Sequence, residues 1–532
     1  MSKAAFRSLF LAALVIGLAF RLGRLDLRPM HHDEANQAVK FGILLETGEY
    51  RYDRTDHHGP TLYYLTLPAA WARAQKTLAA LDEQTLRTVP VAFGAGLLLL
   101  FLPLAGGLGR EAVVLSAFFA ALSPALTYYS RFYIQESLFV FFALGFLITL
   151  GKYALQPCSG WALAAGVFAG LAYATKETSI IVFAGGSAAL ASAWISTRQR
   201  PGPNAAFGPR PAVIAHVLTG LAAALAIVVV LYSSFLRNPS DILESVRAFR
   251  EYATRGIDPG LHTHPWYYYL QLLSHSASGG LFWTEAMILI LALIGALFAL
   301  KGLSGNATSD QVDRARLIFA RERFWLRYFL IYSLFAAGVL SIIRLKTPWN
   351  MLPFYIGFVL LAGSGGAQML RSIRSGFVRF VVLVVLLAGS FHLGVQNWRA
   401  NYRYGADSRN PYVYAQTNPD LLRMIKRVHD LASVHPDGRD MLVKVVAGPY
   451  EQWPLPWYLR DLTRIGYWTD TAGAGGYEGV PVVIASQENA AQLESVIGDR
   501  FQAEFYGLRP EVLLTLYIDR ALWERFLRDR IR

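Results

Sequence analysis

The sequence has little cysteine and little charge. Cys158 is the single cysteine among 532 residues, so neither an intrachain disulfide framework nor a cysteine-based metal cluster can form. Charged residues are 16% of the chain, against roughly 25% in an average soluble domain. Because 54% of the residues are hydrophobic, a single soluble globule is excluded. The sequence also lacks a phosphate-cradling glycine loop, a Walker motif, a nucleophile elbow and an HExxH helix, which argues against nucleotide hydrolysis.

Long apolar runs take the place of charge. A run of about 17–25 apolar residues is long enough to cross a bilayer as a helix. About eleven such spans are predicted, at 7–25, 87–106, 110–129, 134–152, 158–175, 178–196, 211–235, 280–300, 325–343, 349–369 and 377–395. They predict a polytopic α-helical membrane protein in contact with membrane lipids, with an interfacial helix in the stretch 60–80.

The distribution of lysine and arginine predicts the orientation. The formal net charge is +13, but the basic residues gather in alternate loops, for example around 198–210 and 314–323. Much of this charge is therefore a topology signal, and no nucleic-acid partner is expected. No small-residue cleavage site follows the apolar run 9–20, so we predict an uncleaved anchor with a cytoplasmic N-terminus. The predicted location is the cell inner (plasma) membrane.

The character of the chain changes near residue 397. Runs rich in Val, Ile and Leu at 441–447, 481–485 and 512–518 predict strands, and 419–433, 488–498 and 520–531 predict helices. Alternating strands and helices are typical of a small α/β domain. We therefore predict a membrane domain over 1–396, with outer loops 26–86 and 237–279, and an extracytoplasmic α/β domain over 397–532.

Four ionisable residues, His31-His32-Asp33-Glu34, follow the first apolar run at the predicted membrane boundary. Ionisable clusters near a bilayer are costly and usually functional. A carboxylate here could accept a proton from an acceptor hydroxyl or amide, or help to hold a divalent metal. The alternative is a solvated first turn of a helix, which carboxylates also favour.

A second histidine pair, His57-His58, follows the first pair. Together the two pairs could form a zinc or manganese site around the acidic pair, although the spacing matches no particular metal motif. The metal candidates are His31, His32 and Asp33. Histidines that only form turns and hydrogen bonds are the alternative.

Several charged residues interrupt apolar runs on the predicted outer side. They are Arg131 and Glu136, Lys176 and Glu177, and Arg344 and Lys346. Cations at this edge run against the positive-inside trend, which favours phosphate recognition. A snorkelling arginine and an interfacial glutamate are the alternative for the first pair. In the loop 237–279, the aromatic residues around His264 and Trp266 predict an interface belt or a sugar-stacking surface.

The order of these motifs resembles the type C glycosyltransferases, which include the protein O-mannosyltransferases and the lipid A aminoarabinose transferases. The chain is most similar to the "flippase activity-associated" membrane protein family of that superfamily. The resemblance covers nearly the whole chain and is carried by His31-His32-Asp33-Glu34-Ala35, His58-Gly59-Pro60, Tyr129-Ser130-Arg131, Lys176-Glu177-Thr178, His264-Pro265-Trp266-Tyr267-Tyr268 and Trp453-Pro454-Leu455-Pro456-Trp457-Tyr458.

The resemblance implies an inverting glycosyltransferase that takes a sugar from a polyprenyl-phosphate donor at the outer face. Asp33 would deprotonate or orient the acceptor, and Glu34 would support it. In that resemblance, Arg131, Lys176 and Lys346 would neutralise the lipid phosphate as it leaves. Arg344 is a further predicted phosphate ligand, and the predicted substrate contacts are His57, His58, Glu136, Glu177, His264 and Trp266. A divalent metal (Mg, Mn or Zn) is left open, because the superfamily contains both metal-using and metal-free members.

Two other functions are weighed against the transferase. The chain could be a non-catalytic protein that binds lipid-linked sugar and assists a flippase or glycan-assembly partner. It could also be a transporter, but a transporter is expected to place ionisable residues near the bilayer midplane. Here the charges gather at the predicted outer mouths of the spans.

Overall fold

The computed structural model describes residues 1–54, 58–198, 210–257, 263–300 and 310–531. Its contacts divide the chain into two compact units. The helical unit comprises Met1–Leu25, Glu49–Thr66 and Arg87–Arg403. The α/β unit comprises Asp26–Gly48, Leu67–Leu86 and Tyr404–Arg532. Two segments of the predicted outer loop 26–86 therefore group with the C-terminal part of the chain.

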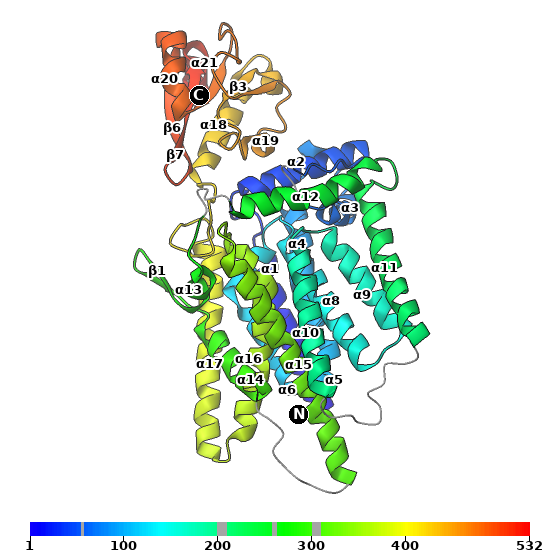
Figure 1. The fold of residues 1–532 in the computed structure, drawn as a ribbon. Helices are drawn as coiled ribbons and strands as arrows, with labels where there is room; N and C mark the ends of the chain where they lie inside the picture. The colour runs from blue at the N-terminus through cyan, green and yellow to red at the C-terminus, as the bar shows by residue number, and fades with distance from the viewer. Residues whose placement is uncertain (55–57, 199–209, 258–262, 301–309, 532) are drawn as a thin grey trace. The chain divides into compact units, whose positions relative to one another are not determined.

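Long helices run side by side in the helical unit (Figure 1). They and their shorter connections are α1 (Lys3–Leu22), α4 (Glu83–Leu99), α5 (Ala105–Leu108), α6 (Arg110–Leu122), α7 (Pro124–Ser130), α8 (Glu136–Leu155), α9 (Ser159–Tyr173), α10 (Ser179–Arg198), α11 (Arg210–Tyr232), α12 (Ser240–Ile257), α13 (Tyr268–Ser274), α14 (Ala286–Leu300), α15 (Asp310–Ile342), α16 (Leu352–Ser372) and α17 (Gly376–Trp398). A small antiparallel hairpin pairs β1 (Ser276–Ser278) with β2 (Leu281–Trp283). The boundary with the α/β unit falls within α3 (Thr61–Ala72) and α4.

Each of the eleven predicted spans overlaps a helix, or the pair α6 and α7, and the span 280–300 begins at the strand β2 before α14. Among the described residues, seven helices are long and apolar enough to cross a membrane, or up to eight if α6 and α7 form one bent span. The apolar helices α9 and α14 are shorter, and the apolar stretch of α10 at Ser179–Ser192 is also shorter than these spans. A helix of 15 residues such as α9 rises about 22 Å, less than a hydrocarbon core of about 30 Å. Within the described ranges, fewer helices reach the full length than the eleven spans predicted.

The bend of 60° between α6 and α7 has a chemical cause. Pro124 opens α7, and the Ser123 side chain accepts from the backbone N–H of Leu126 at 3.2 Å. The buried carboxylate of Glu285 accepts from the backbone N–H of Ala125 at 2.9 Å and from the Tyr355 hydroxyl at 2.6 Å. The N–H groups exposed by the break are thus satisfied inside the bundle.

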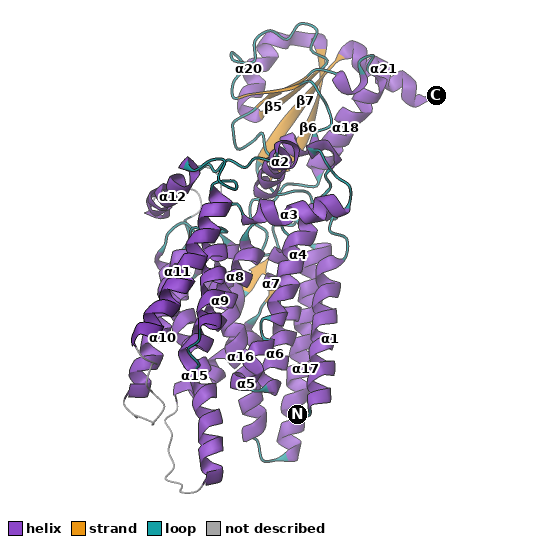
Figure 2. Ribbon diagram, turned by 90° about the vertical axis from the view of Figure 1, so that its right-hand side faces the viewer, coloured by secondary structure: helices purple, strands orange, loops and turns teal. Residues whose placement is uncertain are grey.

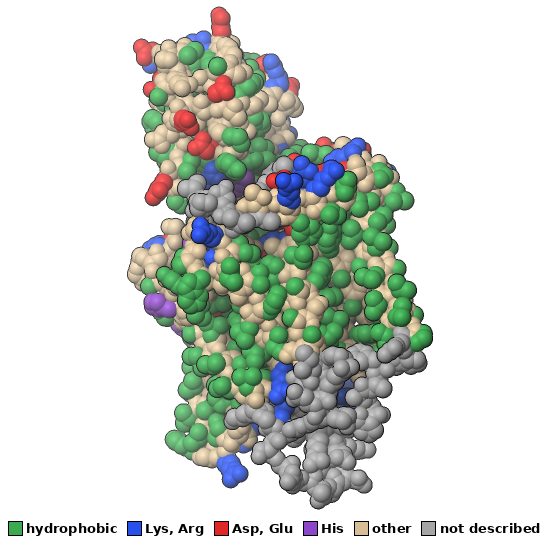
Figure 3. Space-filling model, viewed as in Figure 1, with side chains coloured by type: hydrophobic (Ala, Val, Ile, Leu, Met, Phe, Trp, Pro, Cys, Tyr) green, Lys and Arg blue, Asp and Glu red, His purple; other side chains and the backbone are tan. Residues whose placement is uncertain are grey.

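Packing and surface agree with a membrane environment. The helix α9 packs against both α8 and α11, and a side chain at Gly166 would overlap the carbonyl of Gly220, so glycine permits the close approach of α9 and α11. Leu218, Leu221 and Leu225 of α11 are exposed, and hydrophobic side chains cover the outward faces of these helices (Figure 3). Such contiguous apolar surface is typical of contact with lipid.

A five-stranded sheet forms the centre of the α/β unit, in the order β4-β3-β5-β7-β6. The strands β3, β4 and β5 are parallel, whereas β7 is antiparallel to β5 and to β6. Helices lie on both faces of the sheet (Figure 2). The elements are β3 (Val443–Val446), β4 (Ile465–Trp468), β5 (Val482–Ser486), β6 (Phe501–Arg509), β7 (Val512–Asp519), α18 (Asp420–Val434), α19 (Leu455–Tyr458), α20 (Gln487–Ile497) and α21 (Arg520–Ile531).

Successive strand residues point to opposite faces of the sheet, which explains why helices pack on both faces. Val445 and Ile484 point into a core with Met424 of α18 and Phe526 of α21, whereas Val446 and Val483 pack with Leu493 of α20. The predicted strands over 441–447, 481–485 and 512–518 and the three predicted helices are confirmed. The strands β4 and β6 were not predicted.

The residues just before α2 (His32–Thr47) form hydrogen bonds with the C-terminal part of the α/β unit. The Met30 N–H donates to the Tyr458 hydroxyl at 2.7 Å, and the Thr417 hydroxyl donates to the Met30 carbonyl at 2.7 Å. The Gln416 amide donates to the Pro29 carbonyl at 2.9 Å. The acidic pair is therefore carried by the α/β unit.

Candidate active site

The four ionisable residues open α2 with a capping box. The His31 ring is the N-cap: its Nδ1 accepts from the Asp33 N–H at 3.1 Å. In return, the Glu34 carboxylate accepts from the His31 N–H at 3.0 Å. The other ring nitrogen, Nε2, donates to the Tyr414 carbonyl at 2.9 Å. The first turn of α2 is thus fixed by side chains from the motif itself.

This arrangement separates the two carboxylates. Glu34 is fully buried, where it caps the helix and pairs with Arg28 at 3.5 Å. The Asp33 side chain remains 42% exposed. Asp33 is therefore accessible to a reacting group, while Glu34 holds the turn in place.

The predicted metal site is not supported by these contacts. Both ring nitrogens of His31 already bond to protein atoms, so a metal would have to displace one of them. Among the described residues, no three His, Cys, Asp or Glu side chains gather closely enough to hold a metal ion. His57 lies outside the described residues.

A second group of charges lies in the helical unit, and we call it the buried ion network: His58, Glu136, Lys176, Glu177 and Asn350. The Lys176 ammonium donates to the Glu136 carboxylate and to the Asn350 side-chain oxygen, the latter at 2.9 Å. Both charged side chains are buried. A buried ion pair of this kind holds its geometry because either charge alone would be costly.

The second half of the network joins two sequence motifs. His58 Nδ1 lies 2.7 Å from Glu177 Oε2, and the Tyr52 hydroxyl donates to Glu177 Oε1 at 3.1 Å. Burial by itself would raise the pKa of Glu177, but the His58 ring and the hydrogen bonds from His58 and Tyr52 lower it below its ordinary value of 4.5. Glu177 is therefore held as a carboxylate.

This lowered pKa predicts a pH dependence of stability. A carboxyl group with a depressed folded-state pKa stabilises the fold above its unfolded-state pKa, and the contribution is lost as the pH falls through the folded-state pKa. The difference in thermal midpoint between the wild type and Glu177→Gln should therefore have its full value above pH 4.5. Below pH 4.5 the difference should shrink as the pH falls. Thermal unfolding in detergent measures it. Glu488→Gln, at an exposed position of α20, should show no such trend, and a constant difference for Glu177→Gln would contradict the assignment.

Gly59 explains why the His58-Gly59-Pro60 motif can reach this network. Its N–H donates to the Thr175 carbonyl at 3.2 Å, and the Thr61 N–H donates to the Ala174 carbonyl at 3.2 Å. A Cβ atom at Gly59 would overlap the Ala174 carbonyl oxygen. Only glycine permits this backbone contact.

Gly59→Ala should therefore lower the free energy of unfolding by about 1–3 kcal/mol, the usual cost of overpacking. Denaturant titration in mixed micelles measures the change. Gly338→Ala is the matched control, because a Cβ atom there meets nothing within 4 Å and alanine favours a helix. Equal stability of the two variants would show that the 58–61 segment can shift without cost.

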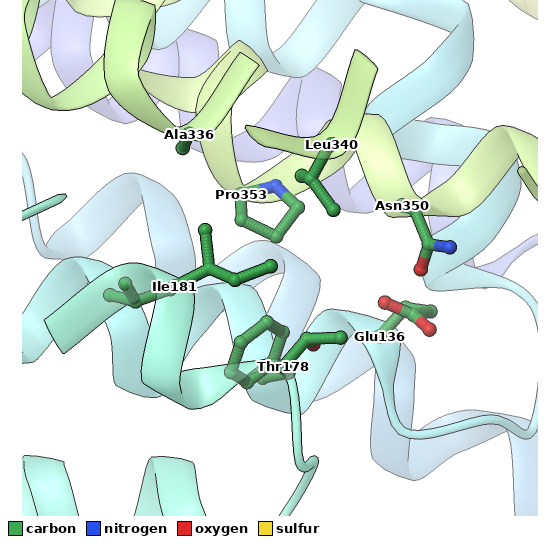
Figure 4. A pocket seen from close by; sticks show the side chains of 9 residues that line it. Glu136, Thr178, Ile181, Ala336, Leu340, Asn350 and Pro353 are labelled. Carbon is green, nitrogen blue, oxygen red and sulfur yellow. The ribbon is translucent and has the colours of Figure 1, made fainter. Parts of the chain in front are cut away.

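An apolar pocket adjoins the network (Figure 4). It lies among residues of α8, α10, α15 and α16 and the turns that precede them, and its cavity volume is only about 10 Å³, roughly enough for one water molecule. Ile181, Leu340 and Pro353 form apolar walls, and Glu136 and Asn350 lie together at one end. Glu136 Oε2 is buried and has no hydrogen-bond partner among the described residues. The pocket thus offers one hydrogen-bond acceptor in an apolar surrounding.

Arg131 has a different environment from the one predicted. Its guanidinium donates to the carbonyls of Phe20, Arg21 and Arg24 at 3.2, 2.9 and 3.1 Å, and it lies over the Tyr402 ring at 4.7 Å. These are carbonyls at and beyond the C-terminal end of α1, where a cation is favoured. These contacts give Arg131 a structural role, and its phosphate contact stays a prediction.

The remaining predicted residues come from two loops that pair with each other. Thr263 and Leu345 form a β-bridge, and the Lys346 ammonium donates to the carbonyls of His264, at 3.0 Å, and Ile343. The His264 ring stacks on Tyr268 at 4.1 Å. Within this pair of loops, Arg344 and Trp266 are exposed. The structure thus brings together residues that the sequence separates by about 80 positions.

Sequence reasoning missed two members of these clusters. Asn350 completes the contacts of Lys176, and Tyr52 completes those of Glu177. A polar residue at the start of an apolar run was a signal for Asn350. Tyr52 gave none, because it follows an ordinary polar stretch.

Comparison with solved structures places this arrangement in a known fold. ArnT from Cupriavidus metallidurans, crystallised with undecaprenyl phosphate, is 14% identical, with a TM-score of 0.58 over 98% of this chain and 99% of that chain. The oligosaccharyltransferase AglB from Archaeoglobus fulgidus, in complex with an inhibitory peptide and a dolichol-phosphate, is 12% identical, with a TM-score of 0.57 over 94% of this chain and 73% of that chain.

The Pmt1-Pmt2 protein O-mannosyltransferase complex of S. cerevisiae, bound to the sugar donor, is also similar, with 11% identity and a TM-score of 0.55 over 80% of this chain and 92% of that chain. No protein-family model and no curated protein matches the sequence. The chain has the fold of the type C glycosyltransferases, polytopic membrane proteins with a C-terminal domain that contains a sheet. The predicted fold class is confirmed.

Proposed function

We propose that this protein is an inverting glycosyltransferase that moves a sugar from a polyprenyl-phosphate donor to a cell-envelope or protein acceptor. The observation that carries the proposal is the accessible Asp33 at the fixed first turn of α2, in a chain whose whole length follows the type C fold. ArnT and AglB are each recorded with a polyprenyl phosphate, which supports this class of donor.

The proposed reaction is a single displacement. Asp33 takes the proton of the acceptor as the acceptor's oxygen or nitrogen atom forms a bond to the anomeric carbon. The bond between that carbon and the phosphate oxygen breaks, and its electron pair leaves with the polyprenyl phosphate. Because a phosphate is a good leaving group, no second carboxylic acid is required. Glu34 keeps Asp33 in place through the cap of α2.

Positive charge near the departing phosphate would stabilise the transition state. Arg344 is the exposed cation of the predicted set, Lys346 lies in the same loop, and Lys176 is held by the buried ion network. The Glu136 oxygen that has no hydrogen-bond partner among the described residues would accept from a hydroxyl of the substrate. Among the described residues, no three metal-ligating side chains lie together, and the proposed step requires only the side chains named above.

We place the protein in the inner (plasma) membrane, with the N-terminus in the cytoplasm and the α/β unit outside it. The basic residues in alternate loops support this orientation. Chemistry at the outer face requires that the donor's sugar is presented on that side. A flippase or glycan-assembly protein is the partner that this arrangement calls for.

A binding protein that presents lipid-linked sugar to such a partner is the second candidate. The contacts within the protein of Lys176, Glu177 and Arg131 favour this candidate. Side chains that already bind protein atoms are less available to act on a substrate. A catalyst and a binding protein differ in whether donor is consumed.

The test uses the purified full-length protein in nanodiscs, with a lipid extract from a strain that lacks it. Mass spectrometry of the lipid-linked sugars, with and without envelope material from the same strain, follows the donor. Consumption of one lipid-linked sugar and its appearance on the envelope material support the transferase. Retention of that lipid on the protein without consumption supports the binding protein.

A further inference from the structure

An aromatic surface lies beside Asp33 within the α/β unit, and we call it the aromatic platform: His32, Tyr450 and Trp453. The His32 ring lies 6.1 Å from the Tyr450 ring, with 29° between their planes, and 6.0 Å from the Trp453 ring. Tyr450 is 76% exposed. A large aromatic side chain is thus exposed to water beside His32, which directly precedes the candidate catalytic residue Asp33, and this exposure requires an explanation.

The backbone beneath the platform is well fixed. The Gln452 amide donates to the Ala447 carbonyl at 2.9 Å and to the Trp468 carbonyl at 3.2 Å, which joins the ends of β3 and β4. Arg509 Nη2 donates to the Tyr450 carbonyl at 2.8 Å. The exposed ring is therefore presented by an ordered turn, and a ligand would not have to order it on binding.

The position of this turn in the sheet is one that α/β proteins use for ligands. Tyr450 follows the carboxyl end of β3, which lies between β4 and β5. The chain leaves β3 toward β4 on one side and returns to β5 on the other. Ligands of open α/β sheets bind outside the carboxyl ends of the strands at such a point of reversal.

Charged groups border the platform. Burial lowers the pKa of Arg509, and the negative charges of Glu451 and Asp33 act in the opposite direction. The guanidinium thus lies within the electrostatic reach of both carboxylates. An aromatic face flanked by a cation and carboxylates combines stacking with hydrogen-bond donors and acceptors.

We infer that the aromatic platform is the acceptor site and that the acceptor is a saccharide. A sugar ring presents C–H groups that stack on an aromatic face, and its hydroxyls match the carboxylate of Asp33 and the guanidinium of Arg509. A peptide acceptor would call for backbone hydrogen-bonding groups, whereas the platform offers side-chain rings. The inference rests on the proposed function: the hydroxyl held here gives its proton to Asp33 and its oxygen to the anomeric carbon of the donor.

The experiment measures saccharide binding separately from transfer. Glycans released from the envelope of a strain lacking the protein are labelled at their reducing ends and titrated against the full-length protein in nanodiscs. The variants are Asp33→Asn, Tyr450→Ala, Tyr450→Phe and Phe505→Ala. Phe505 is the matched control, because it is an aromatic residue 68% exposed on β6 of the same unit. Tryptic peptides from the same envelope are the competitors.

We expect the wild type, Tyr450→Phe and Phe505→Ala to bind the glycan alike. Asp33→Asn should bind it less than 10-fold more weakly, because the asparagine amide can still hydrogen-bond a hydroxyl, and Tyr450→Ala should bind it at least 10-fold more weakly. The inference is overturned if no glycan binds, if Tyr450→Ala binds normally, or if peptides displace the glycan at equal concentration. Tyr450-dependent binding without any transfer by the wild type would instead retain the platform and reject the proposed catalysis.

Discussion

Replacing Asp33 with asparagine is expected to lower the rate of sugar transfer at least about 100-fold, the usual lower bound for removing a general base. Asparagine has the shape of aspartate but cannot take the proton of the acceptor. The side chain is 42% exposed, so the substitution disturbs no packing and the thermal midpoint should stay unchanged. Initial rates in nanodiscs, at equal protein concentration, measure the effect.

Asp437→Asn is the matched control, because Asp437 is an aspartate 54% exposed in the same unit. Its rate should equal that of the wild type. If Asp33→Asn keeps more than about a third of the wild-type rate, Asp33 is not the base, and the binding protein becomes the better description.

Replacing Lys176 with methionine is expected to cost about 3–5 kcal/mol of stability, because it leaves the buried Glu136 carboxylate without its counter-charge. Both side chains are almost fully buried, with 4% and 2% exposure. The double variant Lys176→Met/Glu136→Leu should recover most of the loss, since an apolar pair can replace a buried ion pair. The free energy of unfolding in mixed micelles measures all three proteins.

Lys426→Met supplies the comparison for an exposed ion pair. Lys426 binds Asp430 one turn away on α18 with 73% exposure, and its loss should cost less than about 1 kcal/mol. A similar small loss for Lys176→Met would contradict a buried ion network. Full transfer activity in the stable double variant would in addition remove Lys176 from the phosphate ligands.

The fold could be predicted from sequence where one signal dominated. Apolar length identified the spans, and the runs rich in Val and Ile identified the central strands β3, β5 and β7, which are buried. The strand β4 is a half-buried edge strand that contains Gly466, and β6 is an edge strand with a mixed pattern of exposure. Edge strands carry weaker hydrophobic signals because one side lacks a neighbour. The bend after Ser123 depends on Glu285, which lies too far along the chain for a local pattern to indicate.

The roles of the candidate residues could be predicted only in part. The resemblance implied that Asp33 acts on the acceptor and that Glu34 supports it, but not that Glu34 is buried and does so by capping α2. Arg131 was predicted to bind phosphate because of its charge. The carbonyls that accept its hydrogen bonds belong to residues about 110 positions earlier in the chain. Partners at such distances decide what a charged side chain can do, and a local sequence pattern does not contain them.

The attachment of α2 to the C-terminal part of the chain has a consequence for protein engineering. Residues 26–48 and 67–86 form one compact body with residues 404–532. A chimera that exchanges only the C-terminal segment would break the bonds of Met30, Pro29 and His31 to that segment and would misplace Asp33. To transplant the proposed acceptor site into another protein of this fold, all three segments must be exchanged together.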